Sequence, residues 1–227
     1  MLPRNVFKIM GGEETGGLEK RFRGILRRLK VGSIERKVLE AFLSPLKYKN
    51  SFTHFHYQHS LRVAILLEAI AGFAGSDRKS LVYAGALHDI GKALIPAATL
   101  DITKKSWTRR DGRIMQRHVL SGYQLLQGCF DFTAEIILWH HRFQKGGYPR
   151  KRPPLLHGYS PQTLKIIIDH GRLLALADCY DASHRKREQD GKLVTPGGEE
   201  IRKNMFRMNG DVKELVAGLY QAGIFAI

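Results

Sequence analysis

The stretch that decides the fold class is HYQHSLRVAILLEAIAGF, residues 56–73. Its apolar residues recur at intervals of three and four along the chain, at Val63, Leu66, Leu67 and Ile70. This spacing places them on one face of an α-helix, and His59, four residues before Val63, lies on the same face. The stretch therefore predicts a long helix that carries an imidazole toward the protein interior.

Helical patterns continue on both sides of this stretch. Polar residues suited to cap or open a helix precede the later apolar stripes, at Asp77, Thr108 (in a capping box with Asp111), Asp131 and Ser160. The helix after Asp77 is predicted to stop at Gly91, and shorter helices are predicted within residues 18–47, 197–208 and 211–222. Residues 1–17 and 142–160 read as loose or looped segments. Because strand signals are scarce, the predicted fold is all-α.

Composition limits the class of protein. The chain has 227 residues, of which 43% are hydrophobic, enough to bury a proper core. It has no run of roughly 18 apolar residues, and from its first residues we expect no secretory signal. Its two cysteines, Cys129 and Cys179, are too few for a disulfide framework and favour a reducing compartment. These features predict a cytoplasmic protein without a transmembrane segment.

The chain is strongly basic, with 37 Lys and Arg residues against 21 Asp and Glu and a net charge of +16. Such an excess favours anionic ligands without choosing among them. Basic residues are dense in the tract 20–37, at Lys20, Arg21, Arg23, Arg27, Arg28, Lys30, Arg36 and Lys37. We expect this tract to dock an acidic protein or a polyanion, and a plain solvated face is the alternative.

Several chemistry-bearing side chains lie on the predicted inner faces or at helix ends, at His59, His88, Asp89, His118, His140, His141 and Asp178. A lone histidine on an apolar face is usually a hydrogen-bonded core residue. A group of inward polar residues in one small helical core is different, since each would cost several kcal/mol if left unpaired. Divalent metal ions offset that cost together, because imidazole and carboxylate are good ligands for them.

The order and the sequences of these motifs resemble those of the HD-GYP family of the HD superfamily. The matching segments are HSLRVAIL (59–66), ALHDIGKALIP (86–96), HVLSG (118–122), HH (140–141), GGYP (146–149) and ALADCYDA (175–182). The resemblance covers about residues 55–185. It implies a helical bundle around a two-metal site and hydrolysis of cyclic di-GMP to pGpG or GMP. On this basis we expect residues 1–50 to form a basic helical extension and residues 51–227 to form an HD-GYP-like phosphohydrolase domain.

The resemblance also implies roles for individual residues. The expected metal ligands are His59, His88, Asp89, His118, His140, His141 and Asp178, with Asp89 as the catalytic carboxylate that bridges the ions. Lys92 is the expected catalytic and phosphate-binding lysine, and Tyr148 belongs to the signature loop beside the substrate. In the basic segment after Asp181, either Arg185 or Arg187 is expected to bind a substrate phosphate. The expected cofactor is two divalent transition-metal ions, iron or manganese first, with zinc, nickel, cobalt or magnesium as alternatives.

The sequence departs from the family pattern at three places. The signature loop reads HHRFQKGGYP, one residue short, with Arg142 where the family has an acid. Phe55 stands where three-metal members carry glutamate, which favours two ions, although His56 is a neighbouring substitute. After YDA the chain reads SHRKREQDGK. We therefore keep two other functions open: an HD phosphohydrolase acting on other nucleotides or nucleic-acid ends, and a non-catalytic binding or adaptor module. Asp181 is expected to structure a helix end, or else to reach a metal ion or its water.

Overall fold

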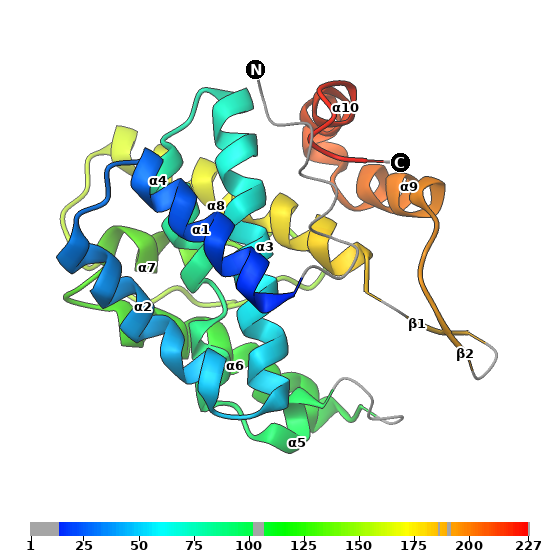
Figure 1. Cartoon of the computed structure of the whole chain (residues 1–227), viewed down its shortest axis with the longest axis horizontal. Coiled ribbons are helices and arrows are strands. Elements are labelled where there is room, and N and C mark those ends of the chain that lie inside the picture. The colour runs from blue at the N-terminus through cyan, green and yellow to red at the C-terminus, as the bar shows by residue number, and fades with distance from the viewer. Residues whose placement is uncertain (1–13, 102–106, 186, 190–191, 227) are drawn as a thin grey trace.

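The computed structural model describes residues 14–101, 107–185, 187–189 and 192–226, and for residues 187–189 and 192–193 the backbone alone. The described chain is a helical bundle (Figure 1), so the predicted all-α class is confirmed. The larger helices are α1 (Thr15–Arg28), α2 (Ser33–Tyr48), α3 (Ser51–Ala74), α4 (Arg78–Leu87), α6 (Arg109–Leu126), α7 (Asp131–Ile137), α8 (Pro161–Ser183), α9 (Gly198–Met208) and α10 (Lys213–Gln221). Short turns of helix are η2 (Ile90–Leu94), α5 (Ala97–Leu100) and η3 (Gly210–Val212).

One antiparallel hairpin was not predicted. Strand β1 (Arg187–Gln189) pairs with β2 (Lys192–Val194), with Arg187 opposite Val194. These strands lie beyond the bundle (Figure 1) and leave its helical character unchanged. Among the described residues, no helix is both long and apolar enough to cross a membrane.

Helix α3 runs through the middle of the bundle and starts earlier than the sequence pattern predicts. Its first residue is Ser51 rather than a position near His56. The reason is a capping box at Asn50, whose side chain accepts from the Thr53 amide at 2.9 Å while Thr53 Oγ1 accepts from the Asn50 amide at 3.1 Å. Likewise α1 begins at Thr15, inside the segment predicted to be loose, and residues 1–13 lie outside the described part.

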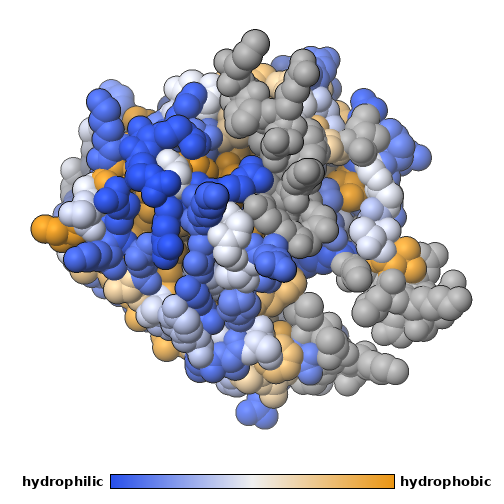
Figure 2. Space-filling view, in the orientation of Figure 1, coloured by the Kyte–Doolittle hydropathy of each residue, from blue (hydrophilic) through white to orange (hydrophobic). Residues whose placement is uncertain are grey.

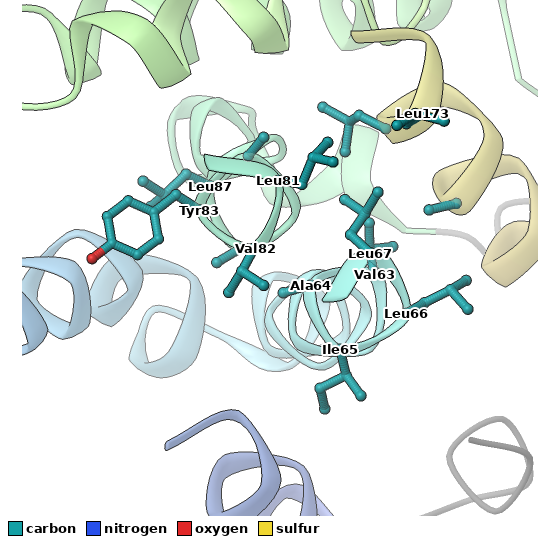
Figure 3. Packing of buried hydrophobic residues seen from close by; sticks show 14 of the residues in the cluster. Val63, Ala64, Ile65, Leu66, Leu67, Leu81, Val82, Tyr83, Leu87 and Leu173 are labelled. Carbon is teal, nitrogen blue, oxygen red and sulfur yellow. The ribbon is translucent and has the colours of Figure 1, made fainter. Parts of the chain in front are cut away.

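Helices α3 and α4 form the centre of the core (Figure 3), where Leu67 of α3 and Val82 of α4 are fully buried. Gly85 allows the two helices to approach closely, because a Cβ there would lie 2.7 Å from the Ala64 Cα. The N-cap prediction for Asp77 is confirmed, since its carboxylate accepts from the Lys79 and Ser80 amides. This close pair of helices is the frame on which the candidate site is built.

The predicted end of helix α4 at Gly91 is wrong. The helix ends at Leu87, and the chain turns through His88 and Asp89 into the tight helix η2. Gly91 packs against the middle of α6, where an added Cβ would overlap the His118 carbonyl oxygen. Glycine is therefore needed here for close approach, and the result is that Asp89 and His118 are brought together.

The N-terminal helices share the core of the rest of the bundle. Leu18, Phe22 and Leu39 belong to the same buried cluster as the residues of α3 and α4. Hydrophilic side chains gather over this face (Figure 2), and two basic side chains of the tract make ion pairs, Arg23 with Glu40 at 3.0 Å and Arg28 with Glu68 at 3.7 Å. The boundary at residue 50 and the anionic partner both stay predictions.

The predictions for the later helices are confirmed. Thr108 and Asp111 form the capping box of α6, Ser160 caps α8, and residues 142–160 contain no helix or strand. Helices α9 and α10 match the two predicted tail helices to within about two residues. The loop between α7 and α8 contacts the last turn of α6, where the Tyr123 hydroxyl donates to the Pro154 carbonyl oxygen, and it brings Tyr148 beside the histidines described next.

Candidate metal centre

Three of the predicted histidines are oriented by backbone carbonyls one turn earlier. His88 Nδ1 lies 2.9 Å from the Gly85 oxygen, His118 Nδ1 2.6 Å from the Met115 oxygen, and His140 Nδ1 2.5 Å from the Ile137 oxygen. A carbonyl can only accept, so Nδ1 is the protonated nitrogen in each neutral ring. The Nε2 lone pair is left available, which is the arrangement that metal-ligating histidines commonly use.

A first set of ligand atoms gathers around His59. His59, His88 and Asp89 offer atoms that all lie within 4.8 Å of one another. The Asp178 carboxylate completes the set, with Oδ1 at 3.1 Å from His59 Nε2 and 4.0 Å from His88 Nε2. These residues come from α3, the α4–η2 turn and α8, and all are buried.

A second set adjoins the first across Asp89. His118, His140 and His141 also place ligand atoms within 4.8 Å of one another. Asp89 Oδ1 lies 3.4 Å from His118 Nε2, while its Oδ2 lies 3.6 Å from His88 Nε2 and 3.7 Å from His59 Nε2. The two carboxylate oxygens therefore face different sets, as a bridging ligand would require.

The donor atoms of the second set fit a cation. Within the described part of the chain, no hydrogen-bond partner meets four buried atoms: Asp89 Oδ1, His118 Nε2, His140 Nε2 and His141 Nδ1. Buried polar atoms are rarely left in this state, because each loses its hydration without replacement. Imidazole nitrogens and carboxylate oxygens at one point are the ligand types that divalent transition metals take.

Electrostatics hold the donors in their metal-binding protonation states. Burial, aided by the Lys92 charge, lowers the pKa of His118 to about 3, and burial beside His88 lowers the pKa of His140 to about 4. Burial alone would raise the pKa of Asp89, but Lys92 and the neighbouring histidines hold it well below its ordinary value. At neutral pH His118 and His140 are thus neutral imidazoles and Asp89 is an ionised carboxylate, the forms that bind a metal ion.

Asp181 holds His59 from outside the ligand set. Its Oδ2 accepts from His59 Nδ1 at 2.6 Å, and the guanidinium of Arg62 donates to both carboxylate oxygens at 2.7 and 3.1 Å. The buried carboxylate thereby fixes the ring so that Nε2 faces Asp89 and Asp178. Asp181 does more than structure a helix end, and its contact is with His59, one of the predicted metal ligands.

The predicted substrate-binding residues border the same centre. Lys92 Nζ lies 2.6 Å from Asp89 Oδ2 and 3.2 Å from His56 Nδ1. The Arg185 guanidinium lies 5.4 Å from the centroid of the Phe55 ring, and no described residue makes a hydrogen bond with its buried Nε. Burial and the charge of Arg185 both act to lower the pKa of His59. The carboxylates of Asp181 and Asp178 outweigh them, so the pKa of His59 is raised. The side chain of Arg187 lies outside the described residues.

Tyr148 covers the second ligand set. Its ring stacks on His141 at a centroid distance of 4.5 Å and meets His118 edge to face at 6.1 Å. The loop that carries it is tied down by the buried Glu135, which accepts from the Leu156 amide at 2.9 Å and pairs with Arg152. Arg142, the residue in place of the family's acid, lies with its guanidinium 4.9 Å from the centroid of the Trp139 ring.

Sequence reasoning missed Arg62 and Glu135, and it named Asp181 without the contact to His59. Arg62 follows His59 by one helical turn, and Asp181 follows Asp178 by one turn, so each shares the inner face of its helix. That spacing was the available signal. Glu135 gave none, because a single acid in an apolar helix does not reveal that a distant loop supplies its partners.

The fold and the site together define a helical metal-binding domain with two adjoining ligand sets. A scan of family models agrees, since the HD domain model matches residues 56–183. This chain belongs to the HD domain family. The family binds divalent metal, and the His and Asp groups described above could hold it.

The chain is also similar to curated proteins and to a solved structure. The chain is 28% identical over 153 residues to the cyclic di-GMP phosphodiesterase response regulator RpfG of Xanthomonas campestris, covering 65% of this chain and 38% of that protein. It is 41% identical over 70 residues to ribonuclease Y of Helicobacter acinonychis, covering 31% and 13%. The crystal structure of the HD domain of the L. monocytogenes phosphodiesterase PgpH superposes with a TM-score of 0.56 at 17% identity, covering 81% of this chain and 95% of that one. The chain spans less than two fifths of the length of these two relatives.

Proposed function

We propose that this chain is a metal-dependent phosphodiesterase that opens cyclic di-GMP to pGpG or GMP. The observation that carries the proposal is the pair of ligand sets that share Asp89, with the ammonium of Lys92 2.6 Å from the same carboxylate. The likeness to RpfG, named as a cyclic di-GMP phosphodiesterase, supports the substrate class.

Two divalent ions would occupy the adjoining sets. His59, His88 and Asp178 would hold one ion, His118, His140 and His141 the other, and Asp89 both. When bound, such ions supply Lewis acidity toward phosphate oxygens and lower the pKa of a water so that it attacks at neutral pH. Iron or manganese is our first expectation, with zinc, nickel, cobalt or magnesium as alternatives.

The side chains around the ions would bind and orient the substrate. Lys92 would stabilise the negative charge that develops on the phosphoryl oxygens during attack. Arg185 would pair with the second phosphate of the dinucleotide, and Arg187 is the alternative for this role. Tyr148 would close the pocket over His141. In this proposal no protein side chain acts as the nucleophile.

A second candidate is an HD phosphohydrolase that acts on other nucleotides or on nucleic-acid ends. The likeness to ribonuclease Y favours it, as do the shortened loop and the altered sequence after Asp181. A non-catalytic adaptor is less favoured, because a chain that had lost turnover would be expected to lose metal ligands first. We also predict a cytoplasmic location, from the two free thiols of Cys129 and Cys179.

A side-by-side assay tests the proposal. Protein purified without chelator and loaded with manganese or iron is given cyclic di-GMP, cyclic GMP–AMP, GMP and a short single-stranded RNA, and products are separated by chromatography. Conversion of cyclic di-GMP to pGpG supports the first candidate. Rapid hydrolysis of the mononucleotide or RNA, with cyclic di-GMP intact, supports the second.

A further inference from the structure

His56 is a buried histidine that lies beside the two ligand sets but belongs to neither. Its side chain is 3% exposed. Its Nδ1 lies 3.2 Å from Lys92 Nζ and 3.5 Å from Asp89 Oδ2. Its other nitrogen, Nε2, is buried and has no hydrogen-bond partner among the residues that the structure describes.

The lysine fixes which nitrogen of His56 carries the proton. An ammonium group has three donors and no acceptor, so the short contact to Lys92 requires a lone pair on His56 Nδ1. A neutral imidazole has one protonated nitrogen, which must then be Nε2. A doubly protonated ring would set one donor against another at 3.2 Å. The contact therefore leaves a buried N–H at Nε2 without an acceptor.

The same tautomer argues against His56 as a ligand to a further ion. A metal ion needs a nitrogen lone pair, and the lone pair of this ring is already used by Lys92. What Nε2–H requires is a hydrogen-bond acceptor. A phosphate group meets that need together with Lys92, since its several oxygens can accept from neighbouring donors at once.

We propose that His56 is a substrate-binding residue, whose Nε2–H donates to a phosphate oxygen of the substrate while its Nδ1 holds the Lys92 ammonium in place. This inference rests on the proposed function, because it assumes a phosphate ester at the metal centre. It adds a hydrogen-bond donor from α3 to the two cationic side chains, Lys92 and Arg185, that are proposed to bind the substrate phosphates.

Two isosteric variants separate the two nitrogens. His56→Gln places an amide donor where Nε2 was and removes the Nδ1 acceptor, whereas His56→Asn keeps an acceptor near Nδ1 and removes the distal donor. Thermal melts and metal content per chain show whether each variant is folded and loaded. The activity probe is bis(p-nitrophenyl) phosphate, and the binding probe is inorganic phosphate, titrated calorimetrically into metal-loaded protein.

We expect His56→Asn to bind phosphate about tenfold to hundredfold more weakly, because it loses one hydrogen bond to a charged group. Its kcat/KM should fall by a similar factor. His56→Gln should lose clearly less in both measurements. The inference is overturned if folded, metal-loaded His56→Asn matches the wild type, or if His56→Gln is the more damaged variant, since His56 would then only position Lys92. Wild-type protein that neither binds phosphate nor cleaves the diester would instead overturn the proposed function.

Discussion

Replacement of Asp181 by asparagine tests how the ligand set around His59 is held. The carboxylate accepts three hydrogen bonds, one from His59 and two from Arg62, at 2.6, 2.7 and 3.1 Å. An amide of the same shape offers one oxygen and one NH2 group, so at least one of these donors would face another donor. The acceptor left to His59 is at best a neutral amide oxygen, which holds the ring less strongly than the carboxylate does.

The expected loss follows from the position of Asp181 behind a ligand. Removing such an outer partner typically weakens metal binding about 10–100-fold, which corresponds to about 1.4–2.7 kcal/mol. The metal-free protein should also lose up to about 3 kcal/mol of unfolding free energy, because the Arg62 charge, with a side chain 17% exposed, loses its ionic partner. The His118 set, which Asp181 does not contact in any described hydrogen bond, should keep its affinity.

The assay is a titration of metal-free protein with manganese in competition with a chromophoric chelator. Wild type should take up two ions, and Asp181→Asn should take up one normally and one 10–100-fold more weakly. Asp211→Asn is the matched control, since Arg172 donates to both oxygens of Asp211 at 2.8 Å and neither residue has a described hydrogen bond to a member of the ligand sets. The reasoning is refuted if Asp181→Asn binds both ions like wild type, or if the control weakens metal binding equally.

Other predictions concern the rest of the site and the surface. Asp89→Ala should stay folded, bind fewer ions and lose turnover, and full phosphodiesterase activity in it would exclude the bridging role. The metal-free protein should lose stability as the pH falls below about 6.5. The reason is that His118 and His140 have folded pKa values of about 3 and 4, so the unfolded chain takes up protons at these residues first. A melting temperature that does not change between about pH 7 and pH 5 would contradict this. Glu135→Gln should speed amide hydrogen exchange in residues 146–149, since the loop loses an ionic anchor, and unchanged exchange would show that other contacts hold it. Heparin binding by the tract at residues 20–37 should weaken steeply with added salt, whereas no binding would favour a plain solvated face.

Much of the bundle follows from local signals. Caps at Asp77, Thr108 and Ser160 set helix starts that the structure reproduces, because such caps depend on residues within one turn. The end of α4 was missed, since the turn through Asp89 depends on close packing between Gly91 and α6. That contact joins segments far apart in the chain, and helical periodicity carries no information about it.

The convergence of the ligands was predictable, but its details were not. Inward faces indicated that His59, His118 and Asp178 would meet, and the structure brings them around Asp89. The tautomer of His56 depends on the single contact with Lys92, which no spacing rule specifies. The roles of the ligands stay proposals until metal is measured in the protein.

The measurement that tests the central claim most directly is hydrolysis of cyclic di-GMP by protein loaded with manganese or iron, followed by chromatography of the products. The account predicts that cyclic di-GMP is converted to pGpG or GMP, and that the conversion stops when a chelator removes the metal. The Asp89→Ala variant should not carry out the conversion. Intact cyclic di-GMP after prolonged incubation with protein shown to contain two ions per chain would contradict it.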